Sequence, residues 1–163
     1  GRIAKTFARL DFKTLGWSRS EKTISGVESH TGEGGLLTVL GQSDFVISIL
    51  PATDQTRGLM NAAMFKNFKR GSTLINVGRG DLIVDDDLVT ALSQKQPAHA
   101  VLDVFHSEPL ASDHPFWGHE GVTITPHVSG WNVVDSIEDV VENYKRFKAR
   151  KPLLHEIDRE AGY

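Results

Sequence analysis

Three short segments carry side chains that could act together on a small polar substrate. The first is residues 76–80 (NVGRG), in which Arg79 stands between two glycines. A planar guanidinium can bind a carboxylate through two parallel hydrogen bonds, and flanking glycines allow the backbone to come close to a ligand. Taken alone, this pattern more often belongs to an exposed loop arginine.

The second and third segments supply a carboxylate and an imidazole. Residues 102–110 (LDVFHSEPL) contain Glu108, and residues 123–127 (TITPH) end in His127. An imidazole can exchange a proton with a reacting oxygen, and a carboxylate beside it favours the imidazolium that gives the proton. The alternative without a function is that Glu108 is a surface glutamate before a proline. His127 would then be an ordinary loop histidine, one of seven histidines in the chain.

Each of these segments lies just past a predicted strand. Short apolar runs predict strands over residues 12–18, 44–50, 72–77, 98–104 and 122–125. Helical periodicity predicts helices over residues 2–10, 36–40, 61–68, 85–93 and 133–148. Such alternation predicts a parallel sheet covered by helices on both faces, with ligands bound at the carboxyl ends of the strands.

Particular residues set the expected ends and faces of these elements. Pro51 should stop the second strand, and Gly41 should end the second helix. Asn61 and Asp85 are the expected N-caps of the next two helices. The apolar face of the first helix consists of Ile3, Phe7 and Leu10. The inner face of the longest helix is expected to consist of Val133, Ile137, Val140, Val141 and Tyr144.

The composition argues against several classes of function. The 163 residues are 39% hydrophobic and 24% charged, as in an ordinary soluble domain. A formal net charge of −3 does not indicate the excess of positive charge with which proteins bind nucleic acid or an anionic membrane. The chain has no cysteine, so disulfide, zinc-thiolate and thiol chemistry are excluded. The longest apolar runs are too short to span a bilayer, so we expect a soluble cytoplasmic protein.

Two histidines could be taken for a metal pair. His114 and His119 flank Pro115 and Gly118 in a predicted loop, with no third ligand in view. Because a protein zinc site needs at least three ligands, we expect no metal here.

The motifs taken together resemble the D-2-hydroxyacid dehydrogenase family, and within it the glyoxylate/hydroxypyruvate reductase A type. NVGRG, LDVFHSEPL and TITPHVSGW occur in that order. Residues 50–59 (LPATDQTRGL), followed by Asn61, match a further family stretch. The helix with Asp85, Asp86, Leu88, Ala91 and Leu92 also agrees, as does the ending over residues 157–163 (IDREAGY).

The resemblance implies a fold and an activity. The fold would be an α/β, Rossmann-like, doubly wound parallel sheet, with residues 1–150 as the NAD(P)-binding domain and residues 151–163 as a tail of the substrate domain. A homodimer that reduces a small 2-keto acid is expected. Arg79 would bind the substrate carboxylate, His127 would donate the proton and Glu108 would be its carboxylate partner. A different substrate, a corepressor-like relative and an inactive fragment are the alternatives.

The resemblance also implies a set of cofactor contacts. In dinucleotide folds an acid after the second strand holds the ribose hydroxyl of NAD, whereas an arginine suits the 2′-phosphate of NADP. Here Ser18 replaces the acid, and basic and hydroxyl groups follow it, with Glu21 the one dissenting residue, so NADP(H) is favoured over NAD(H). The expected contacts are Trp17, Ser18, Arg19, Ser20, Lys22, Leu50, Pro51, Thr56, Val77, Gly78, Arg79, Asp103, His127, Ser129 and Gly130.

The chain departs from the family pattern at its start. The strand and G-x-G-x-x-G loop that bind the pyrophosphate should precede the first helix, but the chain begins at Gly1 and Arg2, at or just after the third glycine. Asp11 also stands where relatives usually have glycine. The missing strand is the central one in the order 3-2-1-4-5-6, so we expect either a longer protein or an unusual closure of the sheet.

Overall fold

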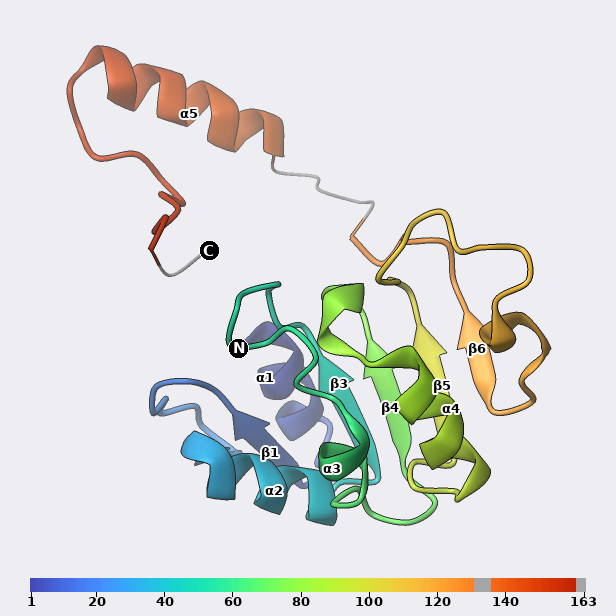
Figure 1. The fold of residues 1–163 in the computed structure, drawn as a ribbon. Coiled ribbons are helices and arrows are strands. Elements are labelled where there is room, and N and C mark those ends of the chain that lie inside the picture. Colours follow the sequence, from blue (N-terminus) through green and yellow to red (C-terminus); the bar gives the residue numbers. More distant parts are fainter. Residues whose placement is uncertain (131–135, 161–163) are drawn as a thin grey trace.

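The computed structural model describes residues 1–130 and 136–160 (Figure 1). Parallel strands alternate with helices, which confirms the predicted Rossmann-like α/β architecture. In chain order the elements are α1 (Arg2–Arg9), β1 (Thr14–Trp17), β2 (Val27–His30), α2 (Gly32–Gln42), β3 (Phe45–Ser48), α3 (Ala62–Phe65), β4 (Thr73–Asn76), η1 (Gly80–Leu82), α4 (Asp85–Ser93), β5 (His99–Leu102), η2 (Pro115–Gly118), β6 (Val122–Ile124) and α5 (Ser136–Lys148).

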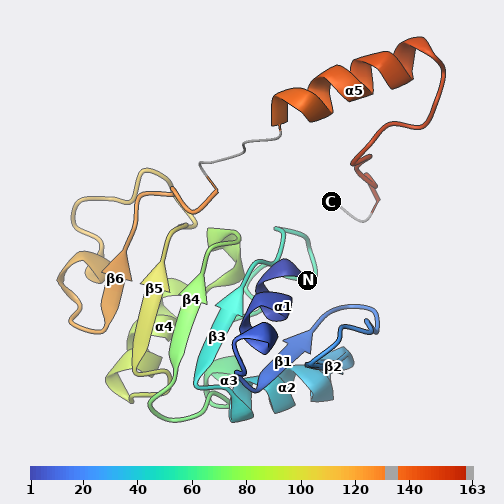
Figure 2. The same cartoon turned by 180° about the vertical axis from the view of Figure 1, so that it is seen from behind.

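The strands form two separate parallel sheets. One pairs β1 with β2, and the other has the order β3-β4-β5-β6. In the larger sheet Phe45 is paired with Thr73, and Thr73 is paired with His99. The first residues of β3, β4 and β5 are therefore in register. Figures 1 and 2 show β1 beside β3, with the strands of both sheets ending on the same side. No described strand joins β1 to β3, so the sheet does not close where the central strand was expected.

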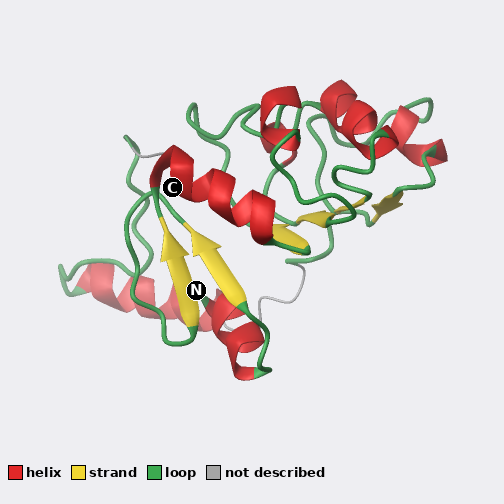
Figure 3. Ribbon diagram, turned by 90° about the horizontal axis from the view of Figure 1, so that it is seen from below, coloured by secondary structure: helices red, strands yellow, loops and turns green. Residues whose placement is uncertain are grey.

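The core lies on one face of the four-stranded sheet. Alternate residues such as Val46, Leu74 and Leu102 belong to it, and the helices α3 and α4 lie over that face in Figure 1. Figure 3 shows the same helices and strands from below. On the other face the intervening residues Ile47 and Ile75 are only half-buried. In the larger sheet the buried core therefore lies on the side of α3 and α4.

Most elements are present where the sequence predicts them, but their ends differ. Each observed strand is one to three residues shorter in total than predicted, since hydrogen-bonded pairing stops before the apolar run does. The strand β2 was not predicted. The second helix runs from Gly32 to Gln42, so Gly41 lies inside it rather than ending it.

The predicted N-caps had different outcomes. Asn61 caps α3, because its side chain accepts hydrogen bonds from the backbone N–H groups of Ala63 (3.0 Å) and Met64 (3.2 Å). That helix ends at Phe65 and continues as turns, not as helix to residue 68. Asp85 is not the cap of α4 but its first residue; Val84 holds the N-cap position.

Two amphipathic helices leave their apolar faces exposed. In α5 the side chains of Ile137, Val140 and Tyr144 are 75%, 68% and 64% exposed, so the predicted inner face is not buried; Val133 lies outside the described residues. Figure 1 shows α5 set apart from both sheets. In α1, Ile3 and Phe7 are 38% and 36% exposed, and Leu10, directly after the helix, is 62% exposed.

The tail after α5 folds back on that helix. Asn143 in α5 donates to the carbonyl of Leu154 (3.1 Å) and accepts from its N–H (2.6 Å). Arg146 donates to the carbonyl of Pro152. Helix and tail are thus joined by hydrogen bonds across residue 150, and the division of the chain there stays a prediction.

Candidate active site

The chemistry-bearing segments meet at the carboxyl ends of the larger sheet. Arg79 follows β4, Glu108 follows β5 and His127 follows β6, and these three strands are neighbours in the order β4-β5-β6. All of them run parallel, so their following loops lie along one edge, at the upper end of the sheet in Figure 1.

The backbone around Arg79 is held by a buried asparagine. Asn76, the last residue of β4, is fully buried and donates from Nδ2 to the carbonyl of Arg79 (3.0 Å). Its Oδ1 accepts the N–H of Gly78 (3.2 Å). The Arg79 guanidinium itself is exposed, and its Nη1 donates to the carbonyl of Gly78 (2.7 Å). The loop is therefore fixed while the charged group faces outward.

The two glycines beside Arg79 allow neighbouring loops to pack closely. A Cβ on Gly78 would lie 2.7 Å from the carbonyl oxygen of Leu50, and one on Gly80 would overlap the backbone of Phe105. Neither glycine has a positive φ. They let three strand-end loops pack backbone to backbone, and the close approach of a ligand that the sequence suggested stays a prediction.

Glu108 and His127 form a hydrogen-bonded pair. His127 Nδ1 lies 2.7 Å from Glu108 Oε2, and Glu108 Oε1 accepts the N–H of Phe105 (2.9 Å). The bond with His127 lowers the pKa of the Glu108 carboxyl, and the N–H of Phe105 lowers it further. The carboxylate is therefore ionised at neutral pH, and it holds Nδ1 so that Nε2 is the ring atom left for a substrate.

Arg79 lies within electrostatic range of this pair. After the hydrogen bonds and burial, the charges of His127 and Arg79 also lower the pKa of Glu108. The side chains of His127 and Glu108 are 50% and 36% exposed, so the group is open to a small molecule. The structure thus brings together the three residues that the sequence singled out.

Asp103 is placed differently from the other candidates. It follows β5, is 1% exposed and accepts hydrogen bonds from Thr125 Oγ1 (2.5 Å) and the N–H groups of Val128 (3.0 Å) and Ser129 (2.9 Å). Burial alone would raise the pKa of this carboxyl, but the hydrogen bonds from Ser129 and Thr125 lower it far below its ordinary value. Asp103 is therefore a buried, ionised carboxylate, and its predicted contact with the cofactor stays a prediction.

Further predicted cofactor contacts line the same edge. The loop after β3 is tightened by Thr56 Oγ1, which donates to the carbonyl of Pro51 (2.6 Å). Val77 donates its N–H to the carbonyl of Ser48 (3.1 Å). Leu50 contacts the backbone of Gly78, as described above. These residues, with Ser129 and the exposed Gly130, frame the loops around Arg79 and His127.

The remaining predicted contacts lie at the end of the smaller sheet. Trp17 closes β1 and donates from Nε1 to the carbonyl of Gly32 (2.8 Å). Ser18 Oγ donates to the carbonyl of Ser20 (2.7 Å) and so shapes the turn that presents Arg19. Arg19, Ser20 and Lys22 are exposed, as is the dissenting Glu21. A cationic turn with hydroxyl groups fits a phosphate-bearing ligand.

Both histidines of the suspected metal pair have contacts within the protein. His114 Nε2 lies 3.3 Å from Asp85 Oδ2, and its Nδ1 accepts the N–H of Phe116. His119 Nδ1 accepts the N–H of Gly121 (3.0 Å). Within residues 1–130 and 136–160 no group of three or more metal-ligating side chains is found.

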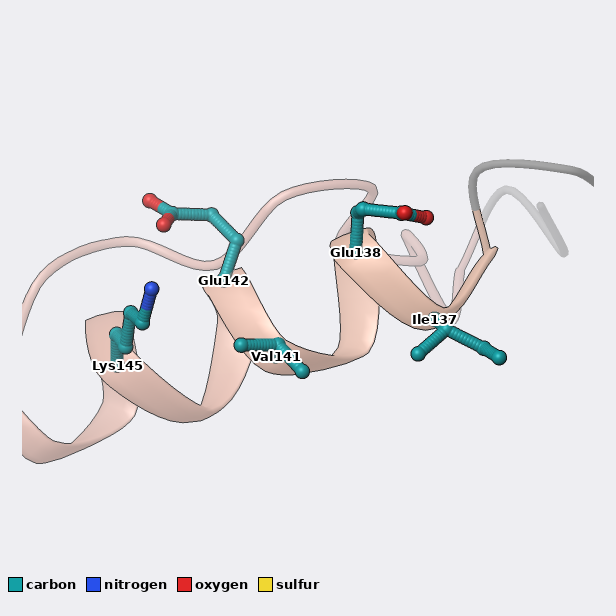
Figure 4. A pocket seen from close by; sticks show the side chains of 5 residues that line it. All are labelled: Ile137, Glu138, Val141, Glu142 and Lys145. Carbon is teal, nitrogen blue, oxygen red and sulfur yellow. The ribbon is translucent and has the colours of Figure 1, made fainter.

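A surface hollow on α5 is unrelated to this edge. Figure 4 shows that it is bordered by side chains of one helix alone, namely Ile137, Glu138, Val141, Glu142 and Lys145. None of the predicted site residues borders it. Among the described residues no helix is both long and apolar enough to cross a membrane.

Two residues that shape the site were not singled out from the sequence. Asn76 was quoted within a motif but given no role, although an asparagine ending a buried apolar strand signals a backbone-holding side chain. Thr125 was not considered, because one threonine in a β-branched run carries no distinguishing pattern.

Comparison with known proteins agrees with this geometry. Residues 1–129 match the family model of the D-isomer specific 2-hydroxyacid dehydrogenase NAD binding domain. The chain therefore belongs to the D-isomer specific 2-hydroxyacid dehydrogenase family, as the motifs predicted. It is 38% identical over 163 residues to glyoxylate/hydroxypyruvate reductase A of Photorhabdus laumondii, with 99% of this chain and 52% of that protein covered.

Solved structures give the same result. A D-isomer specific 2-hydroxyacid dehydrogenase from Xanthobacter autotrophicus Py2, in complex with NADPH and MES, has a TM-score of 0.93 and 38% identity, covering 98% of this chain and 66% of that one. The NADPH-dependent glyoxylate/hydroxypyruvate reductase of Sinorhizobium meliloti, with NADP and sulfate, also has a TM-score of 0.93 and 38% identity, covering 99% and 53%. The chain thus spans about half the length of the curated relatives it matches.

Proposed function

We propose that the protein containing this chain is an NAD(P)-dependent reductase. It converts a small 2-keto acid of the glyoxylate or hydroxypyruvate type into the D-2-hydroxy acid. The observation that carries the proposal is the 2.7 Å contact of His127 Nδ1 with Glu108 Oε2, at strand ends next to that of Arg79. The names of the similar reductases support the substrate class.

The three side chains have separate roles in this proposal. The bound nicotinamide cofactor supplies the hydride. Arg79 binds the substrate carboxylate through its guanidinium. His127 holds a proton on Nε2 and gives it to the oxygen of the keto group, while Glu108 stabilises the imidazolium and fixes the ring. In the oxidation direction His127 is the base.

We also propose NADP(H) as the favoured cofactor. The turn after β1 presents Arg19 and Lys22 together with Ser20, and it has no acid at Ser18 to meet a ribose hydroxyl. The NADPH and NADP complexes of the similar structures support this choice. The residues at the ends of β3 to β6 would hold the nicotinamide half.

The reductase proposal is tested by steady-state NADPH oxidation with glyoxylate, using the full-length protein. His127→Ala should lower turnover by about 10²-fold or more, because the proton donor is lost. NADPH affinity, measured by fluorescence titration, should stay within about threefold, since the other expected cofactor contacts remain in place. His99→Ala, an exposed histidine at the opposite end of β5, is the matched control and should leave the rate unchanged. Equal turnover in the His127 variant would end the assignment.

The cofactor proposal has its own test. Arg19→Ala should weaken NADPH binding by roughly tenfold, the value of one charge-assisted hydrogen bond, and leave NADH binding unchanged. Arg70→Ala, an exposed arginine before the start of β4, is the control. Tighter binding of NADH than NADPH by the unaltered protein would overturn the preference.

We propose a homodimer from the family resemblance, and a cytoplasmic location from the short apolar runs of the sequence. Analytical ultracentrifugation of the full-length protein tests the first. A sedimentation coefficient of a monomer across micromolar concentrations would contradict it.

A further inference from the structure

The carboxylate of Asp81 joins three loops at the edge where the candidate active site lies. Asp81 stands in η1, two residues after Arg79. Its Oδ1 accepts a hydrogen bond from Nη1 of Arg57, in the loop after β3, and lies 3.4 Å from Nδ1 of His106, in the loop after β5. In the sheet order β3-β4-β5, one carboxylate oxygen therefore contacts the loops on both sides of the loop that carries Arg79.

Backbone contacts hold the same three loops close together. The N–H of Gly58 donates to the carbonyl of Asp81 (2.8 Å), which fixes the backbone next to Arg57. On the other side, a Cβ on Gly80 would overlap the backbone of Phe105. Because the backbone already brings the charged groups together, their pairing costs less conformational entropy than the pairing of two free surface side chains.

The loop after β5 also carries the acid of the candidate site. Glu108 lies in this loop, and its Oε1 accepts the N–H of Phe105 (2.9 Å), the residue against which Gly80 packs. Glu108 Oε2 lies 2.7 Å from His127 Nδ1. A shift of η1 relative to the loop after β5 would therefore move Arg79 relative to both the carboxylate and the imidazole.

We propose that Asp81 is a positioning residue, whose carboxylate holds the loops after β3, β4 and β5 together. It thereby sets the separation of the Arg79 guanidinium from the Glu108–His127 pair. This inference rests on the proposed function of those three residues. The side chain of Asp81 is 26% exposed, and its two partners are 56% and 61% exposed. Since exposed ion pairs contribute little to the free energy of unfolding, Asp81 should affect substrate binding far more than stability.

The first test compares Asp81→Asn with the unaltered full-length protein. The amide keeps the shape of the side chain but loses its charge, so the contacts with Arg57 and His106 weaken. The value of kcat/KM for glyoxylate should fall by about tenfold, mainly through a higher KM, because the guanidinium that binds the substrate carboxylate is displaced. This loss is smaller than the roughly 100-fold cost of a 1 Å misplacement, because Asn76 still holds the backbone of Arg79.

Two further readouts distinguish positioning from a general loss of structure. The temperature of thermal unfolding of Asp81→Asn should stay within about 2 °C of the unaltered protein, and NADPH affinity within about threefold. Asp81→Glu restores the carboxylate and should bring kcat/KM back to within about threefold of the original value. Asp86→Asn, at an exposed acid five residues further along the chain, is the matched control and should leave kcat/KM unchanged.

A double-mutant cycle tests whether Asp81 acts through Arg57. If it does, the double variant with Asp81→Asn and Arg57→Gln should be no slower than Asp81→Asn alone. Losses in kcat/KM that multiply would overturn the proposal. If Arg57 itself binds the substrate or the cofactor, Asp81→Asn frees its charge and should lower KM, and this result would also overturn the proposal.

Hydrogen exchange of the full-length protein, followed by mass spectrometry, separates this inference from the reductase proposal. Asp81→Asn should increase deuterium uptake in residues 79–84 and 104–108 by about twofold or more, whereas Asp86→Asn should not. If uptake increases but the unaltered protein reduces no 2-keto acid, the tie between the loops stands and the proposed function fails. If uptake is unchanged, or if it increases while kcat/KM of an active protein stays the same, the positioning role is overturned.

Discussion

At the scale of single residues, the pair of Glu108 and His127 makes the stability of the fold depend on pH. The pKa of Glu108 is lowered in the folded protein, first by the hydrogen bond with His127. The unfolded chain then binds more protons in the window between the folded pKa and the ordinary value of about 4.3. The contribution of Glu108 is fully present above that ordinary value and is lost as the pH falls through the folded pKa.

This sign gives a prediction for Glu108→Gln. Denaturant unfolding at several pH values between about 6 and 3 should show the difference in free energy between unaltered protein and variant shrinking as the pH falls. Glu120→Gln, at an exposed glutamate whose carboxylate lies 3.4 Å from Lys95, is the control and should show little change. A difference that grows toward low pH would contradict the lowered pKa.

The sequence could predict the charged members of the site but not the residues that hold them. Arg79, Glu108 and His127 stand out because each combines a reactive group with a position just past an apolar strand. The hydrogen bond between Thr125 and Asp103 spans 22 residues, and no local pattern encodes such a contact. The glycines around Arg79 were noticed, but only the packed loops show that they face protein backbone.

At the scale of elements, the loops after β3, β4 and β5 pack so closely that a methyl group cannot enter. Gly80→Ala should destabilise the protein by about 1–3 kcal/mol, as overpacking does, and should lower the turnover number because Arg79 shifts with the loop. Thermal unfolding and the glyoxylate assay measure both effects.

The control for that change is another glycine-to-alanine substitution. A Cβ on Gly34 in α2 would meet nothing within 4 Å, so Gly34→Ala should be neutral or stabilise by up to about 1 kcal/mol. If Gly80→Ala behaves like Gly34→Ala, the close packing of the loops around Arg79 is wrong.

Helices and strands with a clear hydrophobic periodicity could be predicted from the sequence. The residues at which they end, and the elements that pack against them, could not. The strand β2 (VESH) has one apolar residue among polar ones, so it gives no strand signal. Asn61 was a correct cap because its side chain bonds locally, within three residues. The apolar face of α5 was recognised from its spacing, but spacing does not show what covers a face.

At the scale of the whole molecule, the chain exposes more surface than a compact domain does. Its accessible surface is 11093 Å², whereas roughly 8,000 Å² is expected for a compact monomer of 18.0 kDa. The excess of about 3,000 Å² includes the apolar faces of α1 and α5 and the half-buried face of the larger sheet. The curated relatives are about twice as long as this chain.

This exposed surface predicts how the 163-residue polypeptide behaves when produced by itself. It should bind a hydrophobic dye such as ANS, and replacing Val140 and Tyr144 of α5 with serine should reduce the fluorescence. Replacing the exposed Lys5 and Glu33 with serine is the control and should leave it unchanged. Absence of dye binding by the unaltered polypeptide would contradict the exposed faces.

The central claim is that Glu108 acts through His127 on one small 2-keto acid. A double-mutant cycle with Glu108→Gln and His127→Gln, measured as kcat/KM for glyoxylate with saturating NADPH, tests it most directly. We predict that the double variant is about as slow as His127→Gln alone, because a carboxylate without its imidazole has nothing to orient. Two results would contradict the account. One is a double variant whose loss in kcat/KM is the product of the two single losses, and the other is a Glu108→Gln variant with unchanged kcat/KM.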